Sequence, residues 1–231
     1  SFVMHNRTAG NAVAALCGRI PNRLWIAGQW DDTGGATQFT DDTTDAQDST
    51  GAGDFVLETT TNDDGYVVAA QVPFNVVTLR VTTASVDATD PVRAVRYSNA
   101  AGTGWTNFTS ADLYISDGIN PAGEYAAGEN LLLFNRPFAW GKVTSLGDIP
   151  AGYYAINVRA TTAPDGTAGL AQSLELWDAA FVNAVVGTNG SLEYTPGSPD
   201  MALWFEYADA VHPLWSVANE GNRTLALIRM G

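Results

Sequence analysis

The stretch "GYYAINVRATTA", residues 152–163, decides the fold class because its side chains alternate. One set of alternate residues is mostly apolar and consists of Tyr154, Ile156, Val158 and Ala160. The other set brings in amide and charged groups and consists of Tyr153, Ala155, Asn157 and Arg159. A period of two is typical of an antiparallel strand with one buried face. We therefore expect a half-buried β-strand here.

The same alternation occurs in "NVVTLRVTT", residues 75–83, where Val77, Leu79 and Val81 share one face. Further short strand candidates are "RLWIAGQW", "RAVRYS", "DLYIS", "NLLLF", "QSLELW", "ALWFEYA" and "RTLALIRM". Turn-forming residues separate several of them, as in the Asn-Asp-Asp-Gly run at 62–65. Because no segment keeps a helical period for three turns, we expect an all-β, antiparallel, jelly-roll-like sandwich with an extended N-terminal arm.

Composition divides the chain into three zones. Residues 1–54 are expected to form an N-terminal arm, with a helical turn or two in "AGNAVAALCG" and a long acidic loop. Residues 55–188 hold most strand candidates and predict the sandwich. Residues 189–231 are expected to add strands that complete the sandwich or contact a neighbouring subunit.

The charge of the chain limits its partners. The formal net charge is −14 and the pI is about 4.2, so phosphate is repelled and nucleic-acid binding is disfavoured. All apolar runs are far shorter than a membrane-spanning helix, so we expect no membrane partner. The single cysteine, Cys17, cannot form an internal disulfide, and we interpret it as a buried, inert thiol.

The sequence offers little for catalysis. Its two histidines, His5 and His212, lie near opposite ends, which disfavours a zinc site or a Ser-His-Asp triad. Carboxylates for glycoside hydrolysis are plentiful, but nothing selects a pair among Glu58, Glu175, Glu193 and Glu206. We therefore expect a protein that is not an enzyme and needs no cofactor.

Calcium binding stays open for the acidic loop. The run "DDTTDAQD" places Asp41, Asp42, Asp45 and Asp48 close together, and carboxylate oxygens are the ligands that Ca²⁺ takes. The spacing is not that of an EF-hand, so a hydrated acidic loop is the favoured interpretation.

Two other surface features are weighed against simpler explanations. Trp105, Trp140 and Trp177 are candidates for stacking on sugar rings, although most tryptophans in a sandwich fill the core. Triplets of the form Asn-x-Ser/Thr begin at Asn6, Asn107, Asn189 and Asn222, and such triplets also arise by chance.

The segment "NRPFAWGKVTSLGDIPAG", residues 135–152, is interpreted as a corner of the scaffold. Pro137 lacks an amide donor and fixes φ, so it ends the preceding strand. We expect Trp140 to fold back over the sheet edge and pack on the core.

Residues 62–164 carry a family resemblance. Matching positions are a Tyr-Ser-Asn strand, a Gly-Trp pair, a strand ending in Phe, a Pro-x-x-Trp corner and a Gly-Tyr-Tyr strand followed by Arg. They fall at Tyr97, Ser98, Asn99, Gly104, Trp105, Phe134, Pro137, Trp140, Gly152, Tyr153, Tyr154 and Arg159. This order resembles surface-exposed virion proteins of tailed bacteriophages, above all capsid decoration proteins. It also resembles extracellular β-sandwich repeats of microbial surface proteins.

The resemblance implies an acidic, non-enzymatic cement protein on the outer surface of a phage head. Its expected partners are the major capsid protein and its own copies, with a trimer as the expected oligomer. We expect the ends of the chain to make these contacts, with Trp25, Trp30, Trp215 and Leu225 as apolar anchors that lack an obvious strand partner. The alternatives are a subunit of an extracellular filament built by strand addition and a carbohydrate-binding surface domain.

Overall fold

A computed structural model describes most of the chain. The described residues are 3–5, 11–33, 38–50, 54–86, 92–109, 113–115, 125, 127–134, 136–163, 166–186, 192–193, 211–217 and 224–226. The chain divides into a sandwich unit, Ile20–Trp177, and a terminal unit made of Ser1–Arg19 and Asp178–Gly231. The sandwich unit thus begins much earlier than residue 55, where the sequence pattern placed its start.

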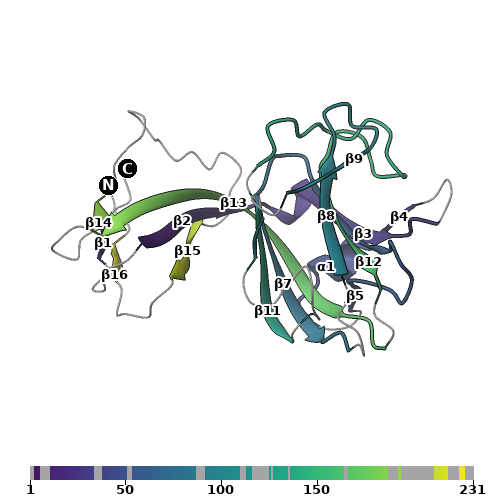
Figure 1. The fold of residues 1–231 in the computed structure, drawn as a ribbon, viewed down its shortest axis with the longest axis horizontal. Coiled ribbons are helices and arrows are strands. Elements are labelled where there is room, and N and C mark those ends of the chain that lie inside the picture. The colour runs from purple at the N-terminus through teal and green to yellow at the C-terminus, as the bar shows by residue number, and fades with distance from the viewer. Residues whose placement is uncertain are drawn as a thin grey trace. The chain divides into compact units, whose positions relative to one another are not determined.

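The sandwich unit consists of two antiparallel sheets that pack against each other, which confirms the predicted all-β sandwich (Figure 1). The first sheet has six strands in the order β4-β3-β6-β12-β8-β9. Their bounds are Phe39–Asp41 (β4), Trp25–Trp30 (β3), Gly65–Ala70 (β6), Tyr154–Thr162 (β12), Val92–Ser98 (β8) and Trp105–Asn107 (β9). Jelly-roll connectivity stays a prediction.

The second sheet of this unit follows the order β10-β11-β7-β13, and β5 also pairs with β13. The bounds are Leu113–Ile115 (β10), Gly128–Phe134 (β11), Val76–Thr83 (β7), Leu170–Val186 (β13) and Phe55–Val56 (β5). Two short helical segments complete the unit, a 3₁₀ turn at Asn22–Leu24 and α1 at Thr43–Gln47. The segment expected to be one long acidic loop therefore contains β4 and α1.

The main core lies between the two sheets. Strand β7 contributes Val77, Leu79 and Val81, each at most 3% exposed, so the predicted buried face of this strand is confirmed. The facing strand β6 contributes Tyr66 and Val68, both fully buried. Alternation along each strand brings these residues to the same interior because every second side chain points the same way.

The six-stranded sheet is covered on its other face as well. Ala155 in β12 and Val67 in β6 pack against Val143, Leu146 and Ile149, which come from the segment 136–153. The prediction of a half-buried strand at residues 152–163 is therefore wrong for β12, whose second face is also buried. The pattern concealed this because alanine and asparagine on that face are small or polar.

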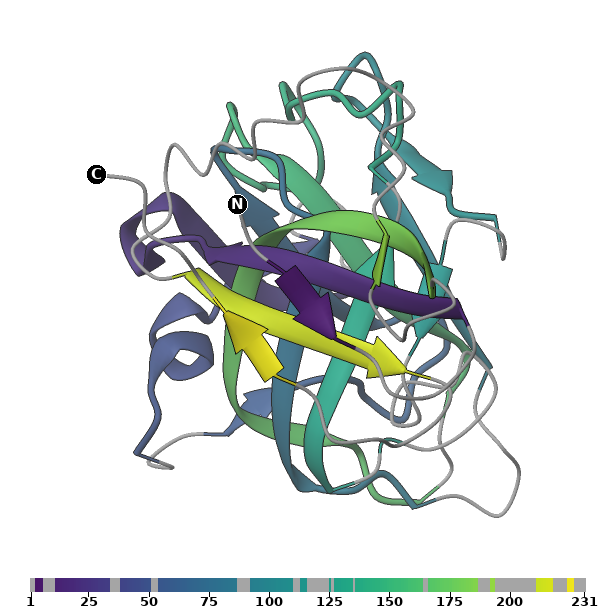
Figure 2. The same ribbon diagram turned by 90° about the vertical axis from the view of Figure 1, so that its left-hand side faces the viewer.

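The terminal unit contains strands from both ends of the chain. Strand β1 (Val3–His5) pairs with β16 (Thr224–Ala226), and β2 (Asn11–Arg19) pairs with β15 (Val211–Val217), as Figure 2 shows. Strand β14 (Leu192–Glu193) pairs with the end of β13. The prediction of helical turns in "AGNAVAALCG" is wrong, because most of this segment forms β2. The predicted strand "ALWFEYA" lies outside the described residues.

Candidate functional site

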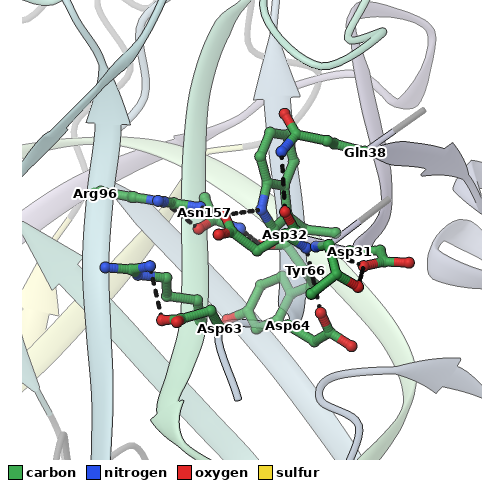
Figure 3. Close-up of polar contacts among 11 residues, drawn as sticks. Asp31, Asp32, Gln38, Asp63, Asp64, Tyr66, Arg96 and Asn157 are labelled. Atoms are coloured by element: carbon green, nitrogen blue, oxygen red, sulfur yellow. Dashed lines mark hydrogen bonds and ion pairs between the residues drawn. The ribbon is translucent and has the colours of Figure 1, made fainter. Parts of the chain in front are cut away.

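The richest group of charged side chains lies on the outer face of the six-stranded sheet, where two strands and two loops supply it (Figure 3). Strands β8 and β12 supply two arginines and an asparagine, and the ends of two loops supply four aspartates. We call this group the Arg96 cluster, and it consists of Asp31, Asp32, Asp63, Asp64, Arg96, Asn157 and Arg159.

Arg96 is the centre of the cluster and is 8% exposed. Its Nε donates to Oδ1 of Asn157 at 2.6 Å, and its Nη2 lies 3.2 Å from Oδ1 of Asp32. The guanidinium also lies 5.4 Å from the ring centre of Trp30 and 5.2 Å from that of Trp105. Burying a cation costs free energy unless other groups compensate its charge. Here one carboxylate, one amide and two indole rings compensate the charge of Arg96.

The burial of Arg96 lowers its own pKa, an effect to which the nearby Arg159 adds. Burial also raises the pKa of Asp32, but hydrogen bonds from Trp30 Nε1 and Arg96 outweigh it, so this pKa is lowered overall. Asp32 therefore stays ionised well into the acid range and is suited to hold Arg96 in place.

The other aspartates tie loops to the sheet. Asp64, 7% exposed, accepts hydrogen bonds from the backbone N–H of Asp32 at 3.2 Å and from the Thr59 hydroxyl at 2.8 Å. Asp63 lies 2.7 Å from Nη1 of Arg159. Each carboxylate thus has a partner inside the chain, and the cluster fixes the loop after β3 and the turn before β6.

Asp32 does not fit the part of the proton donor in glycoside hydrolysis. That reaction needs one carboxyl group with a raised pKa beside a second carboxylate, whereas the pKa of Asp32 is lowered. We interpret the Arg96 cluster as a structural tie that also gives this face fixed charges.

A second charged group lies inside the sandwich. Glu58 and Arg93 form an ion pair whose N–O distances are 2.7 to 2.9 Å, and their side chains are 1% and 2% exposed. The Arg93 guanidinium lies 4.0 Å from the ring centre of Tyr125. Burial raises the pKa of the Tyr125 phenol, so this side chain stays neutral. Sequence reasoning noted Glu58 as a possible catalytic acid, but the structure pairs it with Arg93.

The remaining catalytic candidates are dispersed. Glu175 lies half-buried in β13, Glu193 lies in β14, and Glu206 lies outside the described residues. In the β2–β15 register Cys17 is opposite His212, whereas His5 in β1 is opposite Thr224. The separation along the sequence had concealed the pairing of Cys17 with His212.

Two of the four calcium candidates, Asp41 and Asp48, hold local turns. Asp41 and Asp48 each accept hydrogen bonds from the backbone N–H and the hydroxyl of the threonine two residues later. Asp42 immediately precedes α1, and burial, helped by the charge of Asp45, raises the pKa of Asp42. Within the described parts of the chain, no group of three or more His, Cys, Asp or Glu side chains is placed to hold a metal ion. A D-x-T pattern, which recurs at Asp31 with Thr33, could have signalled these turns.

Two of the four predicted interface residues lie in the sandwich unit and two lie in the terminal unit. Trp25 and Trp30 lie in β3, are 2% exposed, and face Ala70 and Gly65 of β6. The expectation that they lack a strand partner is therefore wrong, because they fill the core of their own chain. Trp215 in β15 and Leu225 in β16 lie in the terminal unit and have strand partners too, opposite Ala14 of β2 and Met4 of β1, so that expectation is wrong for them as well. Their role at an interface stays a prediction.

The corner formed by residues 136–142 confirms the expected packing of Trp140. The Trp140 Nε1 donates to the Ser98 hydroxyl at 3.1 Å and to the Ala155 carbonyl at 3.2 Å. Its ring packs edge-on against Phe74 and Tyr154. Three positions of the family resemblance, Ser98, Trp140 and Tyr154, thus meet in a structural joint. In this joint the Ser98 hydroxyl also donates to the carbonyl of Gly141 at 2.6 Å.

Next to this joint, Phe138 projects fully into solvent, at 108% exposure. The other sugar-stacking candidates, Trp105 and Trp177, are half-buried. Sequence analysis did not single out Arg93 and Arg96, which are the arginines at the centres of the two charged groups. These two residues are three positions apart in β8, so their side chains point to opposite faces of the sheet. A strand with an arginine on each face is the signal that could have identified them.

Comparisons with models of protein families, with curated proteins and with solved structures returned no match for this chain. In the portion of the chain that is described, no helix is long and apolar enough to cross a membrane.

Proposed function

We propose that this chain is a non-enzymatic virion structural protein that decorates and cements the outer surface of a phage head as a trimer. The observation that carries the proposal is the division of the chain into a sandwich unit and a terminal unit built from both chain ends. The resemblance of residues 62–164 to capsid decoration proteins supports it, and three of the matching positions, Ser98, Trp140 and Tyr154, pack together in one corner.

In this proposal the sandwich supplies a rigid body and the terminal unit supplies the contacts. The Glu58–Arg93 pair and the Arg96 cluster satisfy their charges within the chain, so these charges do not depend on a partner outside it. Trp215 and Leu225 are the proposed anchors toward the major capsid protein or a sister subunit. Trp25 and Trp30 are no longer proposed, because the core of the chain already holds them. Many weak contacts on a symmetric shell then add up through avidity.

Labelling of native particles tests the location of the protein. Antibodies against the purified chain, detected by gold labelling in electron microscopy, are expected to mark the outer surface of icosahedral heads. Labelling along fibres would favour the alternative of an extracellular filament, and particles free of label would contradict both.

Binding to particles stripped of this protein tests the anchors. Trp215→Ala and Leu225→Ala are expected to reduce the amount that sediments with the particles, while circular dichroism of the free protein stays unchanged. Phe138→Ala removes the most exposed aromatic side chain described in the sandwich unit and serves as the comparison. If only Phe138→Ala abolishes binding, the contact lies on the sandwich unit and the assignment to the terminal unit is wrong.

A further inference from the structure

One of the four Asn-x-Ser/Thr triplets lies wholly within the described residues, at Asn107, Phe108 and Thr109. This triplet is the acceptor sequence for N-linked glycans, in which the asparagine amide carries the sugar. Whether a triplet can serve depends on its exposure, which a sequence does not show.

The structure exposes the first and third positions of this triplet, Asn107 and Thr109, to solvent. Asn107 ends β9, at the edge of the six-stranded sheet and opposite Arg96 of β8, and both Asn107 and Thr109 are exposed. Phe108 between them is anchored, because its backbone N–H donates to the Val95 carbonyl at 2.9 Å. Its ring packs against Tyr97 and Phe134, with centroid distances of 4.9 and 5.1 Å. A group attached to Asn107 therefore displaces no packed side chain.

An aromatic surface lies beside the acceptor. Trp105 is two residues before Asn107 in the same strand, so the two side chains share a face of the sheet. The Trp105 ring is half-buried and held in place by Trp30, which it meets nearly at right angles with centroids 5.3 Å apart. Arg96 lies over the same ring at 5.2 Å. A fixed indole next to an acceptor asparagine offers an apolar contact to the first sugar.

We propose that Asn107 is an N-glycosylation site and that the first sugar of the glycan packs against Trp105. The donor is an oligosaccharide linked through its anomeric carbon to a lipid phosphate or pyrophosphate. The Asn107 amide nitrogen attacks that carbon, the new C–N bond forms, and the C–O bond to the phosphate breaks. The phosphate leaves with the bonding electron pair, and the amide loses one proton to a base of the transferase. No oxidation or reduction takes place.

Mass spectrometry of the protein isolated from its native source tests the site. Trypsin cuts after Lys and Arg but not before Pro, so it releases residues 97–142 as one fragment that contains a single acceptor triplet. We expect this fragment to carry a glycan mass on Asn107. A native fragment that is unmodified throughout would overturn the proposal.

Two variants of the third position separate acceptor chemistry from other modifications. Thr109→Ser keeps the hydroxyl and is expected to retain the glycan, whereas Thr109→Val keeps the shape without the hydroxyl and is expected to lose it. Modification of Asn107 that persists in Thr109→Val would show that the triplet is not what the cell recognises, and the proposal would be wrong.

The contact with Trp105 has its own readout. Enzymatic removal of the glycan is expected to lower the melting temperature of the native protein, and this shift is expected to disappear in Trp105→Ala. An equal shift in both proteins would overturn the proposed packing while leaving the attachment site in place.

Discussion

The buried ion pair between Glu58 and Arg93 makes a quantitative prediction about stability. Glu58→Gln keeps the shape of the side chain and removes its charge, so the buried Arg93, which also lies over the Tyr125 ring, loses the carboxylate that it contacts at 2.7 to 2.9 Å. Removing one partner of a buried pair costs about 3 to 5 kcal/mol. With a denaturant dependence of about 2 kcal/mol per molar urea, the unfolding midpoint should fall by roughly 2 M.

Urea unfolding followed by tryptophan fluorescence measures this shift, and an exposed pair provides the control. Arg80 and Glu129 are 4.0 Å apart, with side chains 58% and 75% exposed. Glu129→Gln is therefore expected to change the free energy of unfolding by less than about 1 kcal/mol. Equal midpoints for Glu58→Gln and Glu129→Gln would refute the reasoning.

A double variant separates charge from shape at the same place. Glu58→Leu combined with Arg93→Met removes both charges and keeps apolar volume, so it should recover much of the stability lost in Glu58→Gln. If the double variant is as unstable as Glu58→Gln, the lower stability comes from lost packing and not from the loss of the Glu58 charge.

Four further predictions concern titration, a turn and the corner. The pKa of Asp32 is lowered from 3.8, because the Trp30 and Arg96 hydrogen bonds outweigh the effect of burial. The ionised carboxylate therefore stabilises the fold above pH 3.8, and this stabilisation is lost as the pH falls through the folded pKa. Asp32→Asn should lower the free energy of unfolding at pH 7, and the difference from the native protein should shrink in acid. The pKa of Asp42 is raised, chiefly by burial, so its ionised form destabilises the fold at pH 7. Asp42→Asn should therefore raise the melting temperature slightly at pH 7 and leave it unchanged below pH 3.8, the ordinary pKa of the group. A lower melting temperature at pH 7 would contradict this. Gly102 and Gly152 both have positive φ, but only at Gly102 would an added methyl overlap a backbone carbonyl. Gly102→Ala should therefore lower the melting temperature more than Gly152→Ala. Equal losses would show that the backbone conformation alone sets the cost of the substitution. Ser98→Ala should cost about 1 to 3 kcal/mol in urea unfolding, because it removes the hydroxyl that accepts from the buried Ala155 backbone N–H and leaves Trp140 Nε1 with one acceptor in place of two. An unchanged midpoint would show that other groups replace the hydroxyl.

Local pattern was enough to predict the fold class and part of the core. The alternation in β7 identified Val77, Leu79 and Val81 as core residues, because the direction of a side chain in a strand depends only on its position in that strand. The packing of Trp140 was also expected from local sequence, because a proline shortly after an apolar strand predicts a corner there.

Pairings between distant residues could only be read from the tertiary structure. Thirty-five positions separate Glu58 from Arg93 and sixty-one separate Arg96 from Asn157, so no local pattern connects them. The burial of both faces of β12, and of Trp25 in the core, depended on a loop and a neighbouring strand that the alternation does not describe. The sequence alone thus determined that segments such as β7 and β12 extend and which face of β7 is apolar, because these follow from the geometry of a single strand. What covers each face, and which charges meet there, depends on how strands from separate parts of the chain come together, and the tertiary structure decided it.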